Sequence, residues 1–186
     1  QFTVNAGDDQ SICSGEDATL TATPSAGGVE PITYEWFLST DLENAIGTTV
    51  SVTVSPATTT AYTVVATDAN LCTATDEVVV TVNPTITVSV DDQEVCEGED
   101  VTFTAVPGGG SGSYNFAWTV DGSPAGLNQA PLTLPAVTVD AVIAVTVTDA
   151  VFQYSQGTPC SATDNANLTV NPTITVSVDD QEVCEG

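Results

Sequence analysis

The side chains in this sequence that could do chemistry are carboxylates and thiols, because no Lys, Arg or His accompanies its 25 Asp and Glu residues. Without a His or Lys base, the Ser, Thr and Cys side chains lack the partner that ordinarily activates them as nucleophiles. Carboxylates alone remain for acid–base work, and a carboxylate pair of the glycosidase kind needs a cleft that a small β module rarely offers. We therefore predict that the chain is not an enzyme.

The carboxylates recur in short clusters at corresponding places along the chain. Calcium prefers about six to eight oxygen ligands, so this recurrence, with no cation available to neutralise it, predicts a Ca²⁺ site. The alternative is that these are solvated turn residues, a role that Asp favours. The candidate ligands are Asp8, Asp9, Glu16, Asp17, Asp91, Asp92, Glu99, Asp100, Asp179 and Asp180.

The five thiols are spaced singly, which favours disulfides and hence an oxidising compartment. They are Cys13, Cys72, Cys96, Cys160 and Cys184. No Cys-x-x-Cys pair is present, and without His the usual zinc sites lose half of their ligands. If the strands simply run up and down, Cys13 and Cys72 lie at opposite poles, and Cys13 lies near Cys160. Pairing within repeats, pairing between repeats and free thiols all remain open.

The formal net charge of −25 limits the partners of the chain. A chain with no cationic side chain cannot neutralise phosphates, which excludes nucleic acid as a ligand, and anionic membrane surfaces should repel it. No apolar run approaches the roughly 20 residues that span a bilayer, so we expect no direct membrane insertion. Because 41% of the residues are hydrophobic, we expect a folded core rather than a disordered acidic chain.

An internal repeat organises the sequence. The segment TVNPTITVSVDDQEVCEG occupies residues 81–98 and again residues 169–186, and residues 8–17 form a diverged copy of residues 91–100. The sequence therefore predicts a first module over residues 1–83, a second over residues 84–171, and the first strand segment of a third over residues 172–186. Asn83-Pro84 and Asn171-Pro172 mark the joints, which proline should make short and stiff.

Each repeat is a string of short, β-branched segments separated by turn signals, and the spacing is typical of a sandwich of about seven strands. Trp36 and Trp118 fall within the expected strands 32–37 and 114–120, at the place where sandwiches bury a tryptophan, so we expect them in the core rather than on a sugar-stacking platform. The fold class is therefore predicted to be all-β, with tandem immunoglobulin-like (PKD-like) antiparallel β-sandwiches. The expected strands are 18–22, 32–37, 49–54, 61–66 and 77–82, and then 101–105, 114–120, 132–134, 141–148 and 167–170.

A set of motifs carries a family resemblance. The first repeat has Cys13-x-Gly15-Glu16, Tyr34-x-Trp36, Ala61-Tyr62-Thr63-Val64 and Thr67-Asp68-Ala69-Asn70-Leu71-Cys72. The second has Cys96-x-Gly98-Glu99, Phe116-x-Trp118, Val147-Thr148-Asp149 and Cys160. The chain closely resembles the Ig-like and PKD-like repeats of Bacteroidetes cell-surface adhesins, including the filaments used in gliding. It departs from them by inserting residues 150–159, which include Phe152 and Tyr154.

The resemblance implies disulfides within single modules, Cys13–Cys72 and Cys96–Cys160, with Cys184 paired outside this sequence. It also implies an extracellular location on a bacterial cell surface. We expect a structural stalk or filament segment of a repetitive adhesin, with neighbouring repeats as its partners and self-assembly into a fibre open. The alternative is a module that binds glycan or protein directly, which exposed aromatics in segment 150–159 would favour. A spacer in a secreted polysaccharide-degrading enzyme is a third interpretation.

Overall fold

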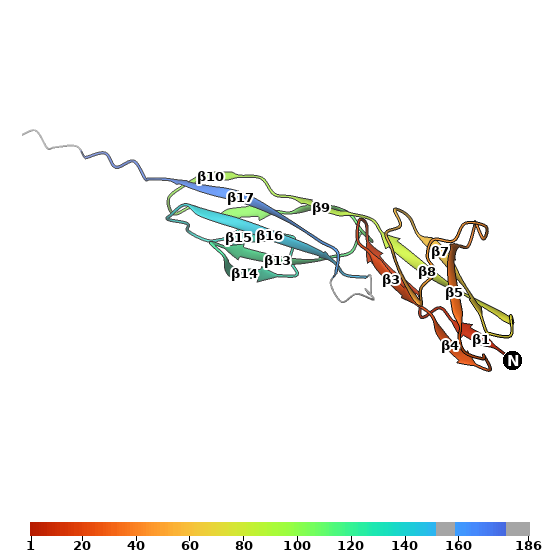
Figure 1. Cartoon of the computed structure of the whole chain (residues 1–186). Coiled ribbons are helices and arrows are strands. Elements are labelled where there is room, and N and C mark those ends of the chain that lie inside the picture. Colours follow the sequence, from red (N-terminus) through yellow and green to blue (C-terminus); the bar gives the residue numbers. More distant parts are fainter. Residues whose placement is uncertain (152–158, 178–186) are drawn as a thin grey trace, which may run out of the picture. The chain divides into compact units, whose positions relative to one another are not determined.

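A computed structural model describes residues 1–151 and 159–177 (Figure 1). Several of its strands are rich in β-branched residues, as in Ser51–Val54 and Ile86–Ser89. The secondary-structure elements of the described residues are all strands, joined by turns and loops, so the all-β prediction is confirmed. The strands of the first repeat are β1 (Thr3–Asn5), β2 (Gln10–Cys13), β3 (Ala18–Thr21), β4 (Thr23–Ala26), β5 (Thr33–Leu38), β6 (Ser51–Val54), β7 (Thr60–Thr67) and β8 (Thr73–Asn83).

The first repeat is built around a sheet in the order β2-β8-β7-β5, accompanied by the pairs β3-β6 and β1-β4. Strands β5, β7 and β8 are antiparallel neighbours, whereas β2 runs parallel to β8. Alternate side chains of β7 and β8 face inward, so that Val64, Val78 and Val80 are fully buried with Leu20 of β3 and Trp36 of β5. Each such side chain contributes roughly 1.5–3 kcal/mol by leaving water.

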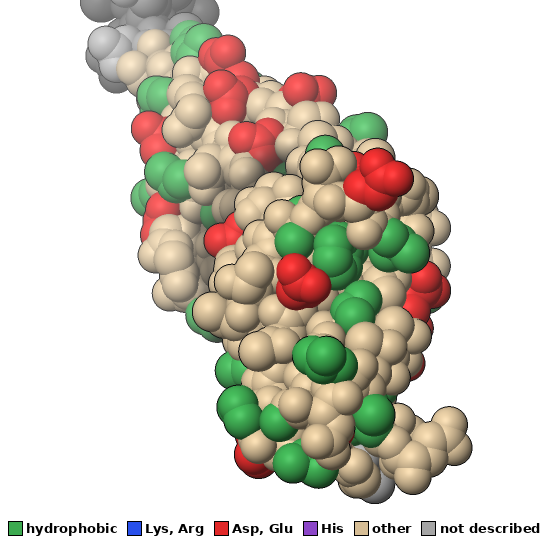
Figure 2. All heavy atoms as spheres, turned by 45° about the vertical axis from the view of Figure 1, so that its right-hand side comes forward, with side chains coloured by type: hydrophobic (Ala, Val, Ile, Leu, Met, Phe, Trp, Pro, Cys, Tyr) green, Lys and Arg blue, Asp and Glu red, His purple; other side chains and the backbone are tan. Residues whose placement is uncertain are grey.

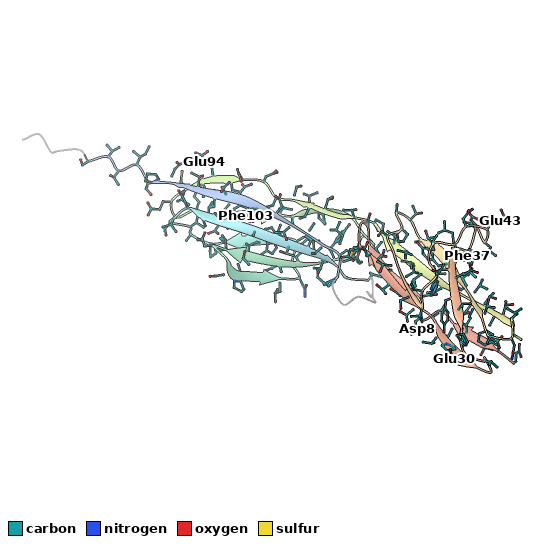
Figure 3. All side chains as sticks on the ribbon, in the orientation of Figure 1. Asp8, Glu30, Phe37, Glu43, Glu94 and Phe103 are labelled. Atoms are coloured by element: carbon teal, nitrogen blue, oxygen red, sulfur yellow. A yellow bond between two sulfur atoms is a disulfide. The ribbon has the colours of Figure 1, made fainter. Side chains whose placement is uncertain are left out.

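The second repeat follows the same plan with one more strand in its main sheet, in the order β10-β17-β16-β13-β14, together with the pairs β11-β15 and β12-β9. Figure 3 shows Phe103 among the strands, whereas Glu94 points outward, and Ile143, Val145 and Trp118 are buried with Phe103. The strands are β9 (Ile86–Ser89), β10 (Gln93–Cys96), β11 (Val101–Thr104), β12 (Val106–Gly109), β13 (Tyr114–Val120), β14 (Ser123–Leu127), β15 (Pro131–Leu134), β16 (Ala141–Asp149) and β17 (Ser161–Asn171).

The sequence did not predict β14, because its Ser-Pro-Ala-Gly-Leu composition has low strand propensity. It forms because Asp121 and Gly122 both take positive φ, 46° and 77°, and close a tight antiparallel hairpin with β13. Asp-Gly between two strands is the sequence signal for such a turn. The last strand of each repeat is also longer than predicted, with 11 residues in both β8 and β17.

The chain divides into two compact units whose borders cut through the second repeat. The first unit holds residues 1–87, 107–115 and 147–162, and the second holds residues 88–106, 116–146 and 163–186. In the described part of the chain, no helix has the length and apolar character needed to cross a membrane. Figure 2 shows acidic side chains scattered over one face between uncharged polar and hydrophobic ones, rather than gathered into one patch.

Candidate functional site

Within the described residues, a disulfide joins Cys13 and Cys160, whose Cα atoms are 5.6 Å apart although the two residues are separated by 147 in sequence. Cys13 is the last residue of β2, and Cys160 directly precedes β17. Cys160 is buried. Both residues belong to the first compact unit, although Cys160 comes from the second sequence repeat. The bond therefore ties residues of two repeats to each other.

The pairing of Cys13 with Cys72, implied by the family resemblance, is wrong. Cys13 lies beside Asn83 at the end of β8, whereas Cys72 directly precedes the start of the same strand at Thr73. Ten residue steps at 3.3 Å place the two ends of β8 about 33 Å apart. A disulfide needs its Cα atoms within about 7 Å, so the length of the strand forbids this bond.

The pairing of Cys96 with Cys160 is wrong for the same reason. Cys96 lies beside Asn171 at the end of β17, and Cys160 directly precedes the other end of that strand. Of the interpretations that the residues themselves left open, pairing between repeats is the one that the structure shows for Cys13 and Cys160. Cys72 and Cys96 are free and exposed, and Cys184 lies outside the described residues.

The two Glu residues of the Cys-x-Gly-Glu motifs cap tight turns. Glu16 accepts a hydrogen bond from the backbone amide of Cys13 through Oε2 at 3.2 Å, and its own amide donates to the Cys13 carbonyl at 3.0 Å. Gly15 supplies the positive φ of 89° that this turn requires. Glu99 caps the amide of Cys96 in the same way at 3.0 Å. These carboxylates therefore fix the chain after each cysteine.

Two of the predicted calcium ligands hold neighbouring strands instead. Asp9 accepts a hydrogen bond through Oδ1 from the backbone amide of Val79 at 2.9 Å. Asp92 does the same for the amide of Asn167, at 2.6 Å. Since Val79 lies in β8 and Asn167 at the corresponding place in β17, each Asp satisfies an amide of the last strand of its repeat.

The Asp residues that follow the Cys-x-Gly-Glu motifs accept hydrogen bonds from residues distant in sequence. Asp17 accepts a hydrogen bond from the Ser55 hydroxyl, and Asp100 accepts one from the amide of Ala136 at 2.9 Å. Asp8 and Asp91 are exposed, while Asp179 and Asp180 lie outside the described residues. Within residues 1–151 and 159–177, no three acidic, Cys or His side chains come together as a metal site. The predicted calcium cluster is not assembled there.

Both tryptophans are buried, as predicted, at 0% exposure for Trp36 and 1% for Trp118. Each indole N–H donates a hydrogen bond to a backbone carbonyl. The acceptor is Thr49 for Trp36, at 3.1 Å, and Gln129 for Trp118, at 2.8 Å. Burial with a satisfied N–H makes these rings part of the core. They offer no sugar-stacking surface.

A buried carboxylate that sequence reasoning missed organises the turn before Cys72. Asp68 is 4% exposed and accepts hydrogen bonds from the amides of Cys72 and Asn70, both at 2.9 Å, and of Val29 at 3.2 Å. The hydrogen bond from Cys72, followed by those from Val29 and Asn70, lowers the pKa of the Asp68 carboxyl against the opposing effect of burial. The Thr67-Asp68 motif, repeated as Thr148-Asp149, was the available signal.

Asp149 plays the equivalent part in the second repeat, at 5% exposure. It accepts hydrogen bonds from the amide of Ser111 at 2.6 Å, the hydroxyl of the same Ser at 2.8 Å, and the amide of Val151 at 2.9 Å. Each buried Asp thus joins the loop before β5 or β13 to residues that lie between the preceding strand and β8 or β17. These carboxylates are structural anchors.

The described residues form several hollows on the surface. One of about 420 Å³ contains the carboxylates of Asp121 and Asp140. Both carboxylates accept hydrogen bonds from backbone amides, Asp121 from Val142 at 2.9 Å and Asp140 from Val170 at 2.7 Å. These two carboxylates therefore hold the backbone of β16 and β17 in place.

This fold, with its buried tryptophans and capped turns, defines an Ig-like β-sandwich. Residues 2–84 match the family described as the Ig-like domain CHU_C associated, so the chain contains an Ig-like domain. Ig-like modules are typically structural or binding modules, and their combination with a disulfide is typical of extracellular or surface proteins.

Known proteins similar to this chain support the fold. The decoration protein of Escherichia phage T5 is 35% identical over 97 residues, which are 49% of this chain and 56% of that protein. The chain thus matches only about half of that curated relative. The first eight Ig domains of the Down Syndrome Cell Adhesion Molecule align with 91% of this chain and 24% of that one at a TM-score of 0.60 and 18% identity. The titin fragment I67–I69 aligns with 89% of this chain and 63% of that one, at a TM-score of 0.53 and 16% identity.

Proposed function

We propose that this chain is a segment of a repetitive stalk or filament on a bacterial cell surface, in which Ig-like repeats are the structural units of an adhesin. The observation that carries the proposal is the disulfide between Cys13 of the first repeat and Cys160 of the second. A covalent tie between successive repeats limits how far they separate under load. A module that only binds a ligand does not need such a tie.

The joints between repeats support the same proposal. At the first joint, two residues, Pro84 and Thr85, lie between the last strand of the first repeat, β8, and the first strand of the second, β9. The sequence Asn-Pro recurs at residues 171–172, directly at the end of β17. Proline fixes its own φ and holds the preceding residue extended, which stiffens a short connection. Repeats stacked end to end would advance by about 35–45 Å each, given strands of about 8–10 residues at 3.3 Å plus loops.

The charge of the chain also suits a surface stalk. Neighbouring stalks that each carry −25 per segment of this length repel one another at low salt. Trypsin-like proteases cleave after Lys or Arg, and this sequence has neither. An acidic segment without such sites would persist outside the cell as separate, intact filaments.

Direct binding is the second candidate, and one comparison favours it. The curated relative from phage T5 is a decoration protein. By analogy, an Ig-like module of this chain would hold a protein or glycan ligand itself. Phe152 and Tyr154, the aromatics that the sequence analysis connected with this alternative, lie outside the described residues.

The stalk proposal is tested on the surface of cells that make the parent protein. Immunogold electron microscopy with antibodies against this chain should label extended material away from the outer membrane. Small-angle scattering of the 186-residue chain should give a largest dimension near two repeat lengths, about 70–90 Å. Label confined to the cell interior, or a largest dimension near one repeat length, would overturn the proposal. Saturable binding to a glycan or protein array would favour the second candidate.

A further inference from the structure

Among the described residues, each half of the observed disulfide is present twice, once bonded and once open. Cys13 and Cys160 are joined, whereas Cys96 and Cys72, which occupy the same positions in the other copy of the repeat, are free and exposed. The bonded pair shows that cysteines at these two positions form a disulfide when they lie next to each other. This raises the question of which cysteines could pair with Cys72 and Cys96.

The backbone around Cys96 reproduces that around Cys13. Each is the last residue of a short strand that runs parallel to the last strand of its repeat, and each pairs with the Asn that ends that strand, Asn83 or Asn171. Each amide is capped by the Glu three residues later. Because these contacts fix the direction of the Cα–Cβ bond, the side chain of Cys96 leaves the backbone in the same direction, relative to its own repeat, as the side chain of Cys13 does.

The backbone around Cys72 likewise reproduces that around Cys160. The carbonyl of Cys72 accepts a hydrogen bond from the amide of Asp68 at 3.0 Å, and the carbonyl of Cys160 accepts one from the amide of Asp149 at 3.1 Å. Both cysteines directly precede an 11-residue strand. Cys72 is thus an open copy of the second half of the same bond.

The environment of the open half differs from that of the bonded half in the way that a missing neighbour predicts. Asn83, beside the bonded Cys13, is 1% exposed, and its side-chain amide donates to Ser11 Oγ at 2.8 Å. Asn171, beside the open Cys96, is exposed. The Asn beside the open cysteine is therefore exposed, whereas the Asn beside the bonded cysteine is buried.

We propose that Cys72 and Cys96 form the same disulfide with other copies of the repeat. Cys96 bonds the cysteine that corresponds to Cys160 in the repeat that follows, and Cys72 bonds the one that corresponds to Cys13 in the repeat that precedes. Between separate molecules of this chain, the equivalent product is a head-to-tail bond from Cys96 of one copy to Cys72 of the next. Such a heterologous contact adds copies head to tail, into an open filament or, where the rotation closes, into a ring.

The chemistry balances with a disulfide oxidant such as oxidised glutathione. One thiolate attacks the oxidant and releases one glutathione thiolate, and the second protein thiolate then displaces the other glutathione. The two protein thiols lose two protons and two electrons in total, and the oxidant becomes two thiols. Because each copy carries −25, the reaction between separate copies needs enough salt to screen their repulsion.

The test uses the full 186-residue chain with Cys184→Ser, which removes a third cysteine of the Cys13 type. On this background, Cys72→Ser keeps only the Cys96 half open, and Cys96→Ser keeps only the Cys72 half open. Each variant alone and an equal mixture are equilibrated at high salt in a glutathione redox buffer. Non-reducing electrophoresis then measures covalent dimer, and a Glu-specific protease maps the bonds, since trypsin has no site in this chain.

The proposal expects several-fold more dimer in the mixture than in either variant alone, carried by a Cys96–Cys72 bond with Cys13–Cys160 intact. Random collisions of exposed thiols would instead give like pairs and mixed pairs in statistical proportion. A mixture with no more dimer than the separate variants overturns the proposal, as does a Cys72–Cys96 bond within single chains of the Cys184→Ser protein. Unchanged circular dichroism shows that the variants fold. Since the assay does not depend on length or location, its failure leaves the stalk proposal standing.

Discussion

The first and second repeats hold their tryptophans alike but leave their cysteines in different states. Trp36 and Trp118 are both buried and both donate to a backbone carbonyl of the loop opposite. Cys13 and Cys160 are bonded, whereas their counterparts Cys96 and Cys72 are free and exposed. Contacts completed inside one repeat are thus reproduced in both copies. A bond that needs a second repeat is made only where that repeat is present.

The largest expected effect concerns the bonded cysteines. Replacing Cys13 and Cys160 with Ser opens a loop of 147 residues, which costs about 5 kcal/mol in the chain-entropy model if both repeats unfold together. Urea denaturation followed by circular dichroism measures the loss. The control, Cys72→Ser with Cys96→Ser, removes two exposed thiols and should change the free energy of unfolding by less than about 0.5 kcal/mol. Equal losses in the two double variants would contradict the assigned bond.

The next effect tests whether the two cores are equivalent. Trp36→Ala and Trp118→Ala each remove a buried ring and should each cost about 3–5 kcal/mol. Because the chain has two Trp residues, each variant leaves one indole whose fluorescence reports on the unmodified repeat, while circular dichroism follows both. Trp→Phe at either site loses the N–H hydrogen bond but keeps most of the packing, and should cost less. A large effect at one position only would show that the cores are not equivalent.

A smaller effect concerns the buried carboxylates of the two repeats. Asp68→Asn and Asp149→Asn weaken hydrogen bonds from three donors each, and we expect each to cost about 1.5–3 kcal/mol. Urea denaturation at pH 7 measures both. Replacing the exposed Asp8 with Asn, which removes one charge at the surface, is the matched control and should change little.

The pH dependence of Asp68 sharpens this test. Hydrogen bonds lower the pKa of the Asp68 carboxyl in the folded protein. The ionised carboxylate therefore stabilises the fold fully at pH values above the pKa of the unfolded chain, about 4, and this stabilisation is lost as the pH falls through the lowered pKa of the folded protein. The difference in unfolding free energy between the natural chain and Asp68→Asn should therefore shrink as the pH is lowered from 7 toward 2. A difference that stays constant over this range would contradict the role of the ionised carboxylate.

The smallest effect is that of calcium. Asp9, Asp92, Glu16 and Glu99 already accept backbone amides, so we expect Ca²⁺ to act only by screening the charge of −25. Millimolar Ca²⁺ should then raise the melting temperature no more than the same concentration of Mg²⁺, and EDTA should reverse both. A specific rise with Ca²⁺ that the double substitution Asp9→Asn and Asp92→Asn abolishes would instead support the predicted calcium site.

Local patterns in the sequence were sufficient for the class of fold and for the core tryptophans. Alternation of β-branched and polar residues is a property of each segment by itself, so it predicts strands before any partner is known. The hairpin of β13 and β14 was not predicted, although Asp121-Gly122 is the sequence signal for its turn. Ser123–Leu127 by itself has low strand propensity. Tertiary pairing overrides such a weak local preference.

The sequence alone determined that the chain contains two all-β repeats with their tryptophans inside, because side-chain periodicity and repetition can be seen in the order of the residues without knowing the fold. Only the tertiary structure decided which cysteines meet and what the carboxylates do. Strand order places Cys13 beside the end of β8, and the length of that strand carries Cys72 about 33 Å away. The carboxyl of Asp68 is likewise buried because the fold brings the amide of Val29 to it. Contacts between residues distant in sequence depend on how strands pack, which no local spacing specifies.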